Sequence, residues 1–256
     1  MALSPQALIK GLVARLLPPP NADSNNNDVA LRQGRYGEAI VLAGMRKQHL
    51  LADEGSYFVA HNNQTGVTIT TTAAFADVSP FLVITNNEPS GGKRLYLDYF
   101  NMVTTTAGSA ASGLTTIQAV VRVDATNRYT SGGTALTVVN PNGDDVTAAR
   151  VTAFAGQVVA PAASGSVRTV AGLRTLRPCV SATVADVVGE MKMLNFGGVE
   201  GGSAGTITVG SANIVPVSLP PVVVAPGGSA LIHVFYAASG TPVAAAYTAE
   251  LGFWMR

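Results

Sequence analysis

Residues 117–124 of this 256-residue chain read IQAVVRVD and decide its fold class. Two sets of side chains alternate along this stretch, with Ile117, Ala119, Val121 and Val123 on one face and Gln118, Val120, Arg122 and Asp124 on the other. A period of two residues is typical of a β-strand with one buried face. The stretch therefore predicts a half-buried strand rather than a helix.

The same period returns in two longer stretches. Near the C-terminus an apolar set alternates with Thr248, Glu250, Gly252 and Trp254; its members are Tyr247, Ala249, Leu251, Phe253 and Met255. In residues 94–103 we expect Leu95, Leu97, Tyr99 and Val103 on the inner face, and Arg94, Tyr96, Asp98 and Met102 on the outer face. Shorter strand-like runs are residues 67–72, 78–85, 135–139, 180–188, 207–209, 222–224 and 230–236.

Turn sequences rich in Gly, Pro, Asn and Asp separate these runs. They include PSGG at residues 89–92, SGG at 131–133, NPNGDD at 140–145 and PGG at 226–228. Many strands with no helical period after residue 55 indicate an all-β fold. We expect an antiparallel β-sandwich, jelly-roll-like, over residues 56–256.

The N-terminal region lacks this strand pattern. Residues 1–20 predict an amphipathic helix, which Pro5 begins and the prolines at 18–20 end. Residues 21–55 predict a linker and an extended arm, with one short helix between Gly44 and Ala52. The candidate assembly contacts of this region are Leu8, Leu12, Leu16, Arg32, Arg35, Tyr36, Arg46 and Lys47.

Few side chains are charged. Charged residues make up 12% of the chain, against about 25% in an average domain, and the formal net charge is +1. This balance lacks the basic footprint of a nucleic-acid-binding protein, and no apolar run is long enough for a membrane helix. We therefore expect neither nucleic acid nor a membrane as a partner.

Residues 201–249 contain no Asp, Glu, Lys or Arg, which predicts burial against other subunits. We expect a homo-oligomer, with a trimer favoured by analogy with jelly rolls on viral shells. Some residues of the expected oligomer interface also fill the domain's own core; the interface set is Val222, Val223, Val224, Phe235, Tyr236 and Tyr247.

No motif for catalysis or metal binding stands out. The three histidines, His49, His61 and His233, lack ligand spacing, and no G-x-S-x-G sequence marks a nucleophilic serine. Cys179, the only cysteine, is interpreted as a small apolar residue entering a strand. We expect no catalytic residue, no metal, no cofactor and no enzymatic activity. A surface calcium ion at residues 140–145 stays open as the alternative to a plain turn.

Three segments carry a resemblance to a known group of proteins. They are LRQGRYGE at residues 31–38, DEGSYF at 53–58 and PPVVVAPGG at 220–228. The chain resembles virion structural proteins of tailed bacteriophages, including capsid decoration and head-associated proteins. The resemblance implies a virion component at the capsid surface or the head–tail region and carries over no catalytic residue.

The sequence thus predicts a non-enzymatic virion protein that decorates or cements a capsid by contacting the major capsid protein or neighbouring virion proteins. A tail-machine component, such as an adaptor, collar or fibre anchor, is the alternative within the virion. A carbohydrate-binding jelly-roll module is the alternative from another class. That module would need aromatic side chains gathered on one face or a pair of carboxylates, and only 6% of the residues are aromatic.

Overall fold

The structure is a computed structural model. It describes residues 47–63, 66–69, 74–106, 116–143, 148–163, 165–177, 188–197, 217–236 and 245–256. The predicted helix at 1–20 and most of the predicted arm lie outside these ranges, as do the predicted strands at 180–188 and 207–209, except that Val188 is described. No helix in the described ranges has the length and apolar character needed to cross a membrane.

One short helix and two sheets make up the described chain. The helix is α2 (Lys47–Asp53). The strands are β1 (Tyr57–His61), β2 (Val67–Thr68), β3 (Leu82–Asn86), β4 (Leu95–Thr106), β5 (Ile117–Asp124), β6 (Ser131–Ala135), β7 (Thr137–Val139), β8 (Val151–Val159), β9 (Arg168–Arg177), β10 (Met191–Phe196), β11 (Val217–Leu219), β12 (Val223–Val224), β13 (Ser229–Tyr236) and β14 (Ala246–Met255).

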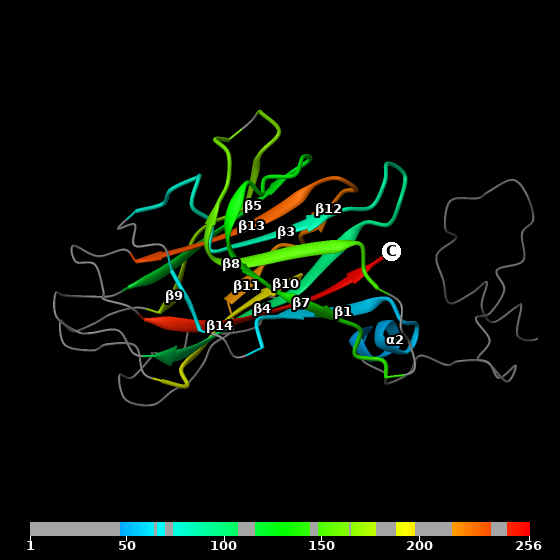
Figure 1. The fold of residues 1–256 in the computed structure, drawn as a ribbon, viewed down its shortest axis with the longest axis horizontal. Helices are drawn as coiled ribbons and strands as arrows, with labels where there is room; N and C mark the ends of the chain where they lie inside the picture. Colours follow the sequence, from blue (N-terminus) through cyan, green and yellow to red (C-terminus); the bar gives the residue numbers. More distant parts are fainter. Residues whose placement is uncertain are drawn as a thin grey trace, which may run out of the picture. The chain divides into compact units, whose positions relative to one another are not determined.

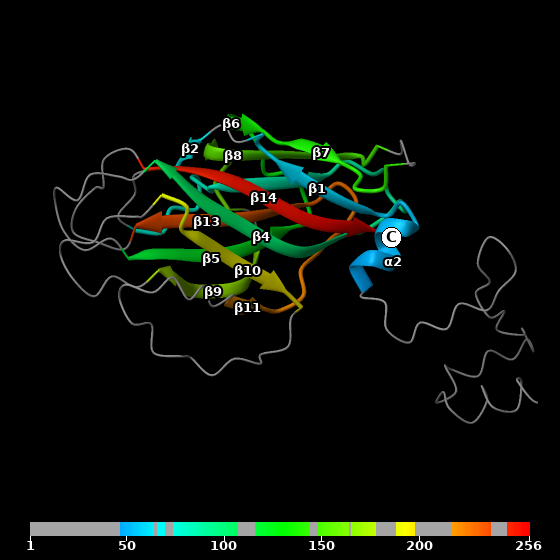
Figure 2. The same cartoon turned by 90° about the horizontal axis from the view of Figure 1, so that it is seen from below.

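The strands form two mostly antiparallel sheets packed as a sandwich, which confirms the predicted fold class at this level. One sheet has the order β11-β10-β4-β14-β1-β7, with β12 also paired to β4 and β2 to β14 (Figure 1). The other sheet has the order β6-β8-β3-β13-β5-β9. Figure 2 shows β14, β4 and β10 side by side in one layer, with α2 beside the end of β14.

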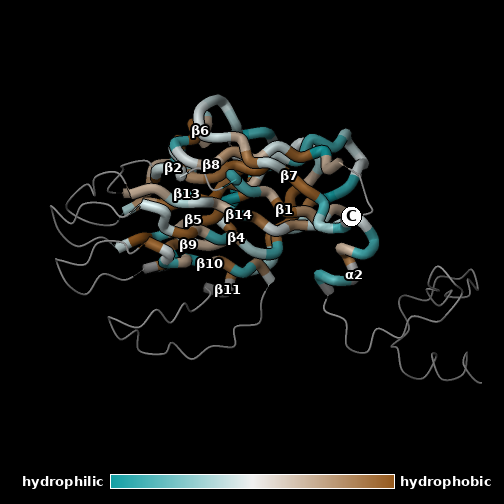
Figure 3. The backbone as a smooth tube through the Cα atoms, turned by 60° about the horizontal axis from the view of Figure 1, so that its bottom comes forward, coloured by the Kyte–Doolittle hydropathy of each residue, from teal (hydrophilic) through white to brown (hydrophobic). Residues whose placement is uncertain are grey.

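The hydrophobic core lies between the two sheets. The rings of Phe81 and Phe100 meet there, with their centroids 6.1 Å apart. Ala230, Ile232 and Val234 of β13 belong to the same buried cluster. In Figure 3 the hydrophobic colour is concentrated on strands such as β13 and β5. Burial of this apolar surface is the main force holding the sheets together.

A β-bulge in β4 reverses part of the predicted alternation. Gly252 of β14 pairs with Tyr99 while Phe253 pairs with Leu97, so Asp98 is an extra residue in β4. After such a bulge the side chains change face. Asp98 and Tyr99 consequently both lie on the outer face. The prediction that Tyr99 and Val103 face inward and Met102 faces outward was wrong, because Met102 is buried in the core.

The chain also differs from prediction between residues 131 and 139. The expected turn at 131–133 is instead the start of β6, in which Gly132 and Gly133 adopt positive φ angles beside a register shift. The single strand expected at 135–139 is divided: β6 pairs with β8 in one sheet and β7 with β1 in the other. The intervening Leu136 is buried in the core.

Helix α2 belongs to the same compact unit as the sandwich. That unit comprises Arg46–Arg256, so it begins about ten residues before the boundary expected at residue 56. Gly55, at a φ of 68°, ends the helix: its N–H binds the Ala52 carbonyl and the Ser56 N–H binds the Leu51 carbonyl. This is the Schellman arrangement, for which glycine is the favoured residue. The short helix predicted between Gly44 and Ala52 thus corresponds to α2.

Candidate functional site

A groove of about 670 Å³ opens on the outer face of the eight-stranded sheet. Its floor comes from β4, β10 and β14, and its border includes Gln48 of α2 and Val223 of β12. The groove lies where the neighbour of β4 changes, since β12 pairs with the beginning of β4 and β10 with its later residues. The groove could hold a ligand, and most of its lining side chains are aromatic or polar.

Three aromatic residues stand in one row across neighbouring strands. Tyr57 of β1 pairs with Trp254 of β14, and Trp254 pairs with Tyr96 of β4. The rings of Tyr96 and Trp254 are parallel within 2°, with centroids 5.4 Å apart. Val223 of β12 extends the row, because it pairs with Tyr96. Strand pairing thus builds an aromatic platform from residues far apart in sequence.

Two carboxylates lie beside this platform, and each accepts a hydrogen bond from a tyrosine hydroxyl. The Tyr57 hydroxyl donates to Asp98 Oδ2 at 2.9 Å, and the Tyr99 hydroxyl donates to Glu250 Oε1 at 2.6 Å. Gln48 Nε2 also approaches Asp98 Oδ1, at 3.4 Å. Such charge-assisted bonds orient both carboxylates in the groove.

The tyrosine hydroxyls stay protonated at all ordinary pH values. Burial raises the pKa of Tyr57, and the nearby Asp98 carboxylate raises it further. Burial likewise raises the pKa of Tyr99, and its hydrogen bond to Glu250 adds to the effect. Both hydroxyls therefore act as hydrogen-bond donors to the carboxylates.

Gly252 makes room for this arrangement. It lies on β14 between Glu250 and Trp254, on the outer face, yet it is buried. A Cβ atom at this position would lie 2.5 Å from the Tyr57 hydroxyl and even closer to the Tyr99 ring. The missing side chain thus lets the two tyrosines lie over β14 and reach their carboxylates.

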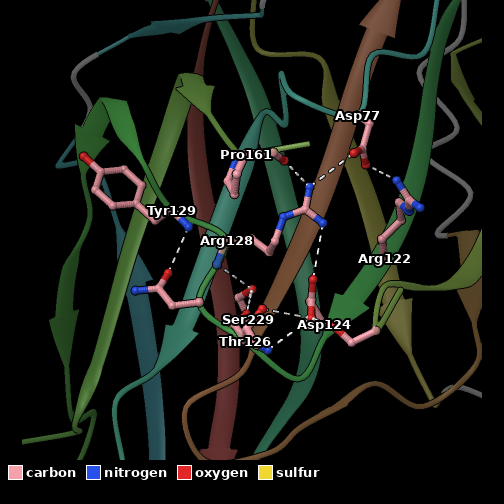
Figure 4. A network of polar contacts seen from close by, with 10 residues as sticks. Asp77, Arg122, Asp124, Thr126, Arg128, Tyr129, Pro161 and Ser229 are labelled. Carbon is pink, nitrogen blue, oxygen red and sulfur yellow. Dashed lines mark hydrogen bonds and ion pairs between the residues drawn. The ribbon is translucent and has the colours of Figure 1, made fainter. Parts of the chain in front are cut away.

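The outer face of the six-stranded sheet carries a different polar cluster, drawn in Figure 4. The buried guanidinium of Arg128 donates to Asp124 Oδ2 at 3.3 Å, to Asp77 Oδ2 at 3.2 Å and to the Pro161 carbonyl. Arg122 pairs with the same Asp77. Since Asp77 precedes β3 and Asp124 ends β5, the cluster attaches the segment before β3 to the sheet. Two cations face two anions, which suits a structural role.

Asp124 is stabilised in its charged form. Burial by itself raises the pKa of this carboxyl, but hydrogen bonds from Ser166, Thr126 and Arg128 outweigh burial and lower its pKa below the ordinary value. Ser229 also joins the cluster, accepting from the Arg128 N–H at 3.2 Å and donating to the Thr126 carbonyl at 2.8 Å.

His233 lies under the same segment. It is 1% exposed, and the ring of Phe75 covers it at a centroid distance of 4.9 Å. Neither ring nitrogen has a hydrogen-bond partner in the described part of the chain. Burial lowers the pKa of His233 to about 4, although Asp77 opposes the shift. The imidazole is therefore neutral near pH 7, as befits a packed residue.

The other histidines considered in the sequence analysis lie far from His233. His49 is exposed on α2, and His61 ends β1 in the sheet opposite to His233. Within the described ranges, no three His, Cys, Asp or Glu side chains gather as potential metal ligands. Cys179 lies outside the described residues, as do Asp144 and Asp145 of the candidate calcium turn.

The assembly contacts predicted in the arm are not described either. Leu8, Leu12, Leu16, Arg32, Arg35, Tyr36 and Arg46 lie outside the described ranges, and Lys47 begins α2.

Most of the predicted interface residues are buried within the subunit. Four of them, Val222, Val224, Tyr236 and Tyr247, belong to the core cluster between the sheets. Phe235 is 5% exposed, with Phe75 beside it. Side chains enclosed in this way have no surface to offer a second copy. Of this set only Val223 is exposed, at 39%.

Sequence reasoning missed both the aromatic row and the Arg128 cluster. Tyr96 and Trp254 were each expected on an outer face, but nothing local indicates that β4 and β14 pair with these two residues opposite each other. Asp77 lies far from Asp124 and Arg128 in the sequence, and the spacing of the three residues matches no motif.

Comparisons with known proteins give no relative. No protein-family model matches the chain, and neither the curated proteins nor the solved structures provide a match.

Proposed function

We propose that the sandwich is a jelly roll and that the protein is a non-enzymatic structural component of a tailed-bacteriophage virion. In this proposal it decorates or cements the capsid through contacts with the major capsid protein or neighbouring virion proteins. The observation that carries the proposal is the order of the strands.

Eight strands pair in a nested manner. The first pairs with the last, β1 with β14, and the next pair is β3 with β13. Then come β4 with β10 and β5 with β9. All four pairs are antiparallel, and successive pairs alternate between the two sheets. A ribbon of four strand pairs rolled into two sheets is the jelly-roll plan, which is common in viral capsid and lectin domains.

Three of the additional strands extend this plan at one edge. β6, β7 and β8 lie in sequence between β5 and β9; β7 continues the sheet of β1, whereas β8 and β6 continue the sheet of β3. Such an insertion widens both sheets beside β1 and β3 without changing the nested pairing.

Two further observations support assembly with other protein subunits. The phage-like segments at residues 31–38, 53–58 and 220–228 extend the resemblance over both ends of the chain. Large apolar side chains also stay exposed on the described surface, among them Leu173 at 54% and Val188 at 61%. Association with identical or different subunits would cover them.

The test is a quantitative mass-spectrometric analysis of gradient-purified virions of the phage that encodes the chain. We expect the chain at tens to hundreds of copies per particle, in fixed proportion to the major capsid protein. A chain present in the infected-cell lysate but missing from purified virions would overturn the proposal. A copy number near six or twelve would favour the tail-machine alternative.

A further inference from the structure

We infer that the groove on the outer face of the eight-stranded sheet binds an uncharged carbohydrate. Tyr96 and Trp254 would form the stacking platform, and Asp98 and Glu250 would accept hydrogen bonds from sugar hydroxyls. This inference rests on the groove alone and stands apart from the proposed virion role.

The aromatic pair supplies the first element of recognition. A pyranose ring presents a face of C–H groups, which packs well against the electron-rich face of an aromatic ring. Tyr96 and Trp254 are half-buried residues that line the groove with parallel rings. The two rings stack on each other, and the pairing of β4 with β14 holds the stacked pair in place. The ring face turned away from the stacking partner is the one left for a sugar.

The carboxylates supply the second element. An ionised carboxylate can accept about four hydrogen bonds. Asp98 receives one from Tyr57 and a longer one from Gln48, and Glu250 receives one from Tyr99. Both carboxylates can therefore accept further hydrogen bonds while their tyrosine partners fix their orientation. Groups oriented before binding lose little entropy when the ligand arrives.

Charge selects the class of sugar. Among the described residues that line the groove, Asp98 and Glu250 are the charged ones, and no Lys or Arg is present. Two anions disfavour sialylated, sulfated or phosphorylated glycans by like-charge repulsion. A ligand rich in hydroxyl donors and lacking negative charge, such as a neutral hexose or N-acetylhexosamine oligosaccharide, fits these acceptors.

A single tryptophan makes the binding measurable in the unmodified protein. Trp254 is the only Trp in the chain, so its emission reports directly on the platform. The full-length protein is first screened on an array of neutral hexose and N-acetylhexosamine oligosaccharides, together with sialylated and sulfated ones. Each neutral oligosaccharide bound is then titrated while Trp254 fluorescence is recorded.

We expect binding to at least one neutral oligosaccharide and a saturable change in Trp254 emission at the same concentrations. Trp254→Ala should weaken this binding about tenfold or more by calorimetry, and Trp254→Phe should restore part of it. Asp98→Asn, which keeps the side-chain shape, should also weaken binding.

The matched control is Tyr129→Ala. The ring of Tyr129 stacks on that of Phe154 in the other sheet, with the ring centroids 4.0 Å apart, and this sheet does not line the groove. Loss of the Tyr129 ring should change the binding affinity by less than twofold. Absence of any neutral ligand, binding confined to acidic glycans, or a Trp254→Ala protein that is folded by circular dichroism and still binds with unchanged affinity would each overturn the inference.

Discussion

Arg128 lies four residues after Asp124, and its guanidinium contacts the Asp124 carboxylate at 3.3 Å with both side chains almost fully buried. The same guanidinium reaches Asp77, in the segment before β3. One cation therefore joins the end of β5 to a segment that covers β13. Phe75 of this segment lies against His233 and Phe235 on the outer face of β13, all eight residues of which are buried.

Removal of this cation should destabilise the protein strongly. Arg128→Met removes the cation that is paired with the buried Asp124 carboxylate, and breaking a buried ion pair from one side typically costs about 3–5 kcal/mol. Urea denaturation followed by circular dichroism measures the loss. Arg168→Met, at an exposed position of β9, is the control and should change the unfolding free energy by less than about 0.5 kcal/mol. Equal stabilities of the two variants would contradict a structural role for the cluster.

His233 should make stability depend on pH between about 6.5 and 4. Its pKa is lowered from 6.5 to about 4 in the folded protein, so the unfolded chain binds a proton first as the pH falls. The contribution of the neutral His233 to the free energy of unfolding is therefore complete above pH 6.5 and declines as the pH falls to 4. It amounts to at most roughly 3 kcal/mol.

The measurement is urea unfolding at pH 7.5 and pH 4.5. In the His233→Leu variant this part of the pH dependence should disappear, whereas replacement of the exposed His49 by Gln should preserve it. A wild-type protein that is equally stable at both pH values would show that His233 is not held neutral.

Gly252 should be intolerant of a side chain. Gly252→Ala places a methyl group where the Tyr57 hydroxyl and the Tyr99 ring lie, so both tyrosines must leave their carboxylates. Overpacking of this kind costs about 1–3 kcal/mol. Gly172 of β9 is the matched control, because a Cβ there meets open space and should have almost no effect. Thermal unfolding of both variants distinguishes the two glycines, and a larger loss in Gly172→Ala would refute the assigned geometry.

The purified protein should associate with itself, with a trimer favoured. Leu173 lies on β9, at the end of the six-stranded sheet, and is 54% exposed. A large apolar side chain on an edge strand favours pairing with another chain. Multi-angle light scattering should give a mass near three times that of the subunit, and Leu173→Asp should lower it. Thr134→Asp, exposed on β6, is the control for added charge. A stable wild-type monomer at micromolar concentration is the opposing result.

The sequence predicted the strands whose alternation is regular. In β5 and β14 the expected inner residues lie in the core or pack against it, since one face of each strand meets the core. The register shifts between β5 and β9 come from extra residues in β9, so the alternation of β5 itself is kept. The alternation predicted for β4 is correct only up to Asp98. The extra residue Asp98 moves every later side chain of β4 to the opposite face, and nothing in the local composition marks such a bulge.

Sites made by distant pairings were beyond a sequence reading. Tyr57, Tyr96 and Trp254 are spread over almost 200 residues and meet only because β1 and β4 flank β14. The low aromatic content made a carbohydrate module less favoured, yet half-buried aromatic side chains gather on one outer face. Within the expected interface set, Val222, Val224 and Tyr247 fill the core between the sheets, as was expected from the sequence for some members of the set.

Cryo-electron microscopy of the intact phage tests whether the protein decorates the capsid. We expect density that fits the two-sheet sandwich on the outer capsid surface, in copies that follow the icosahedral lattice and contact the major capsid protein. Copies arranged around the tail axis would contradict capsid decoration and support the tail-machine alternative. A particle map that contains no density for the sandwich would contradict a structural role in the virion altogether.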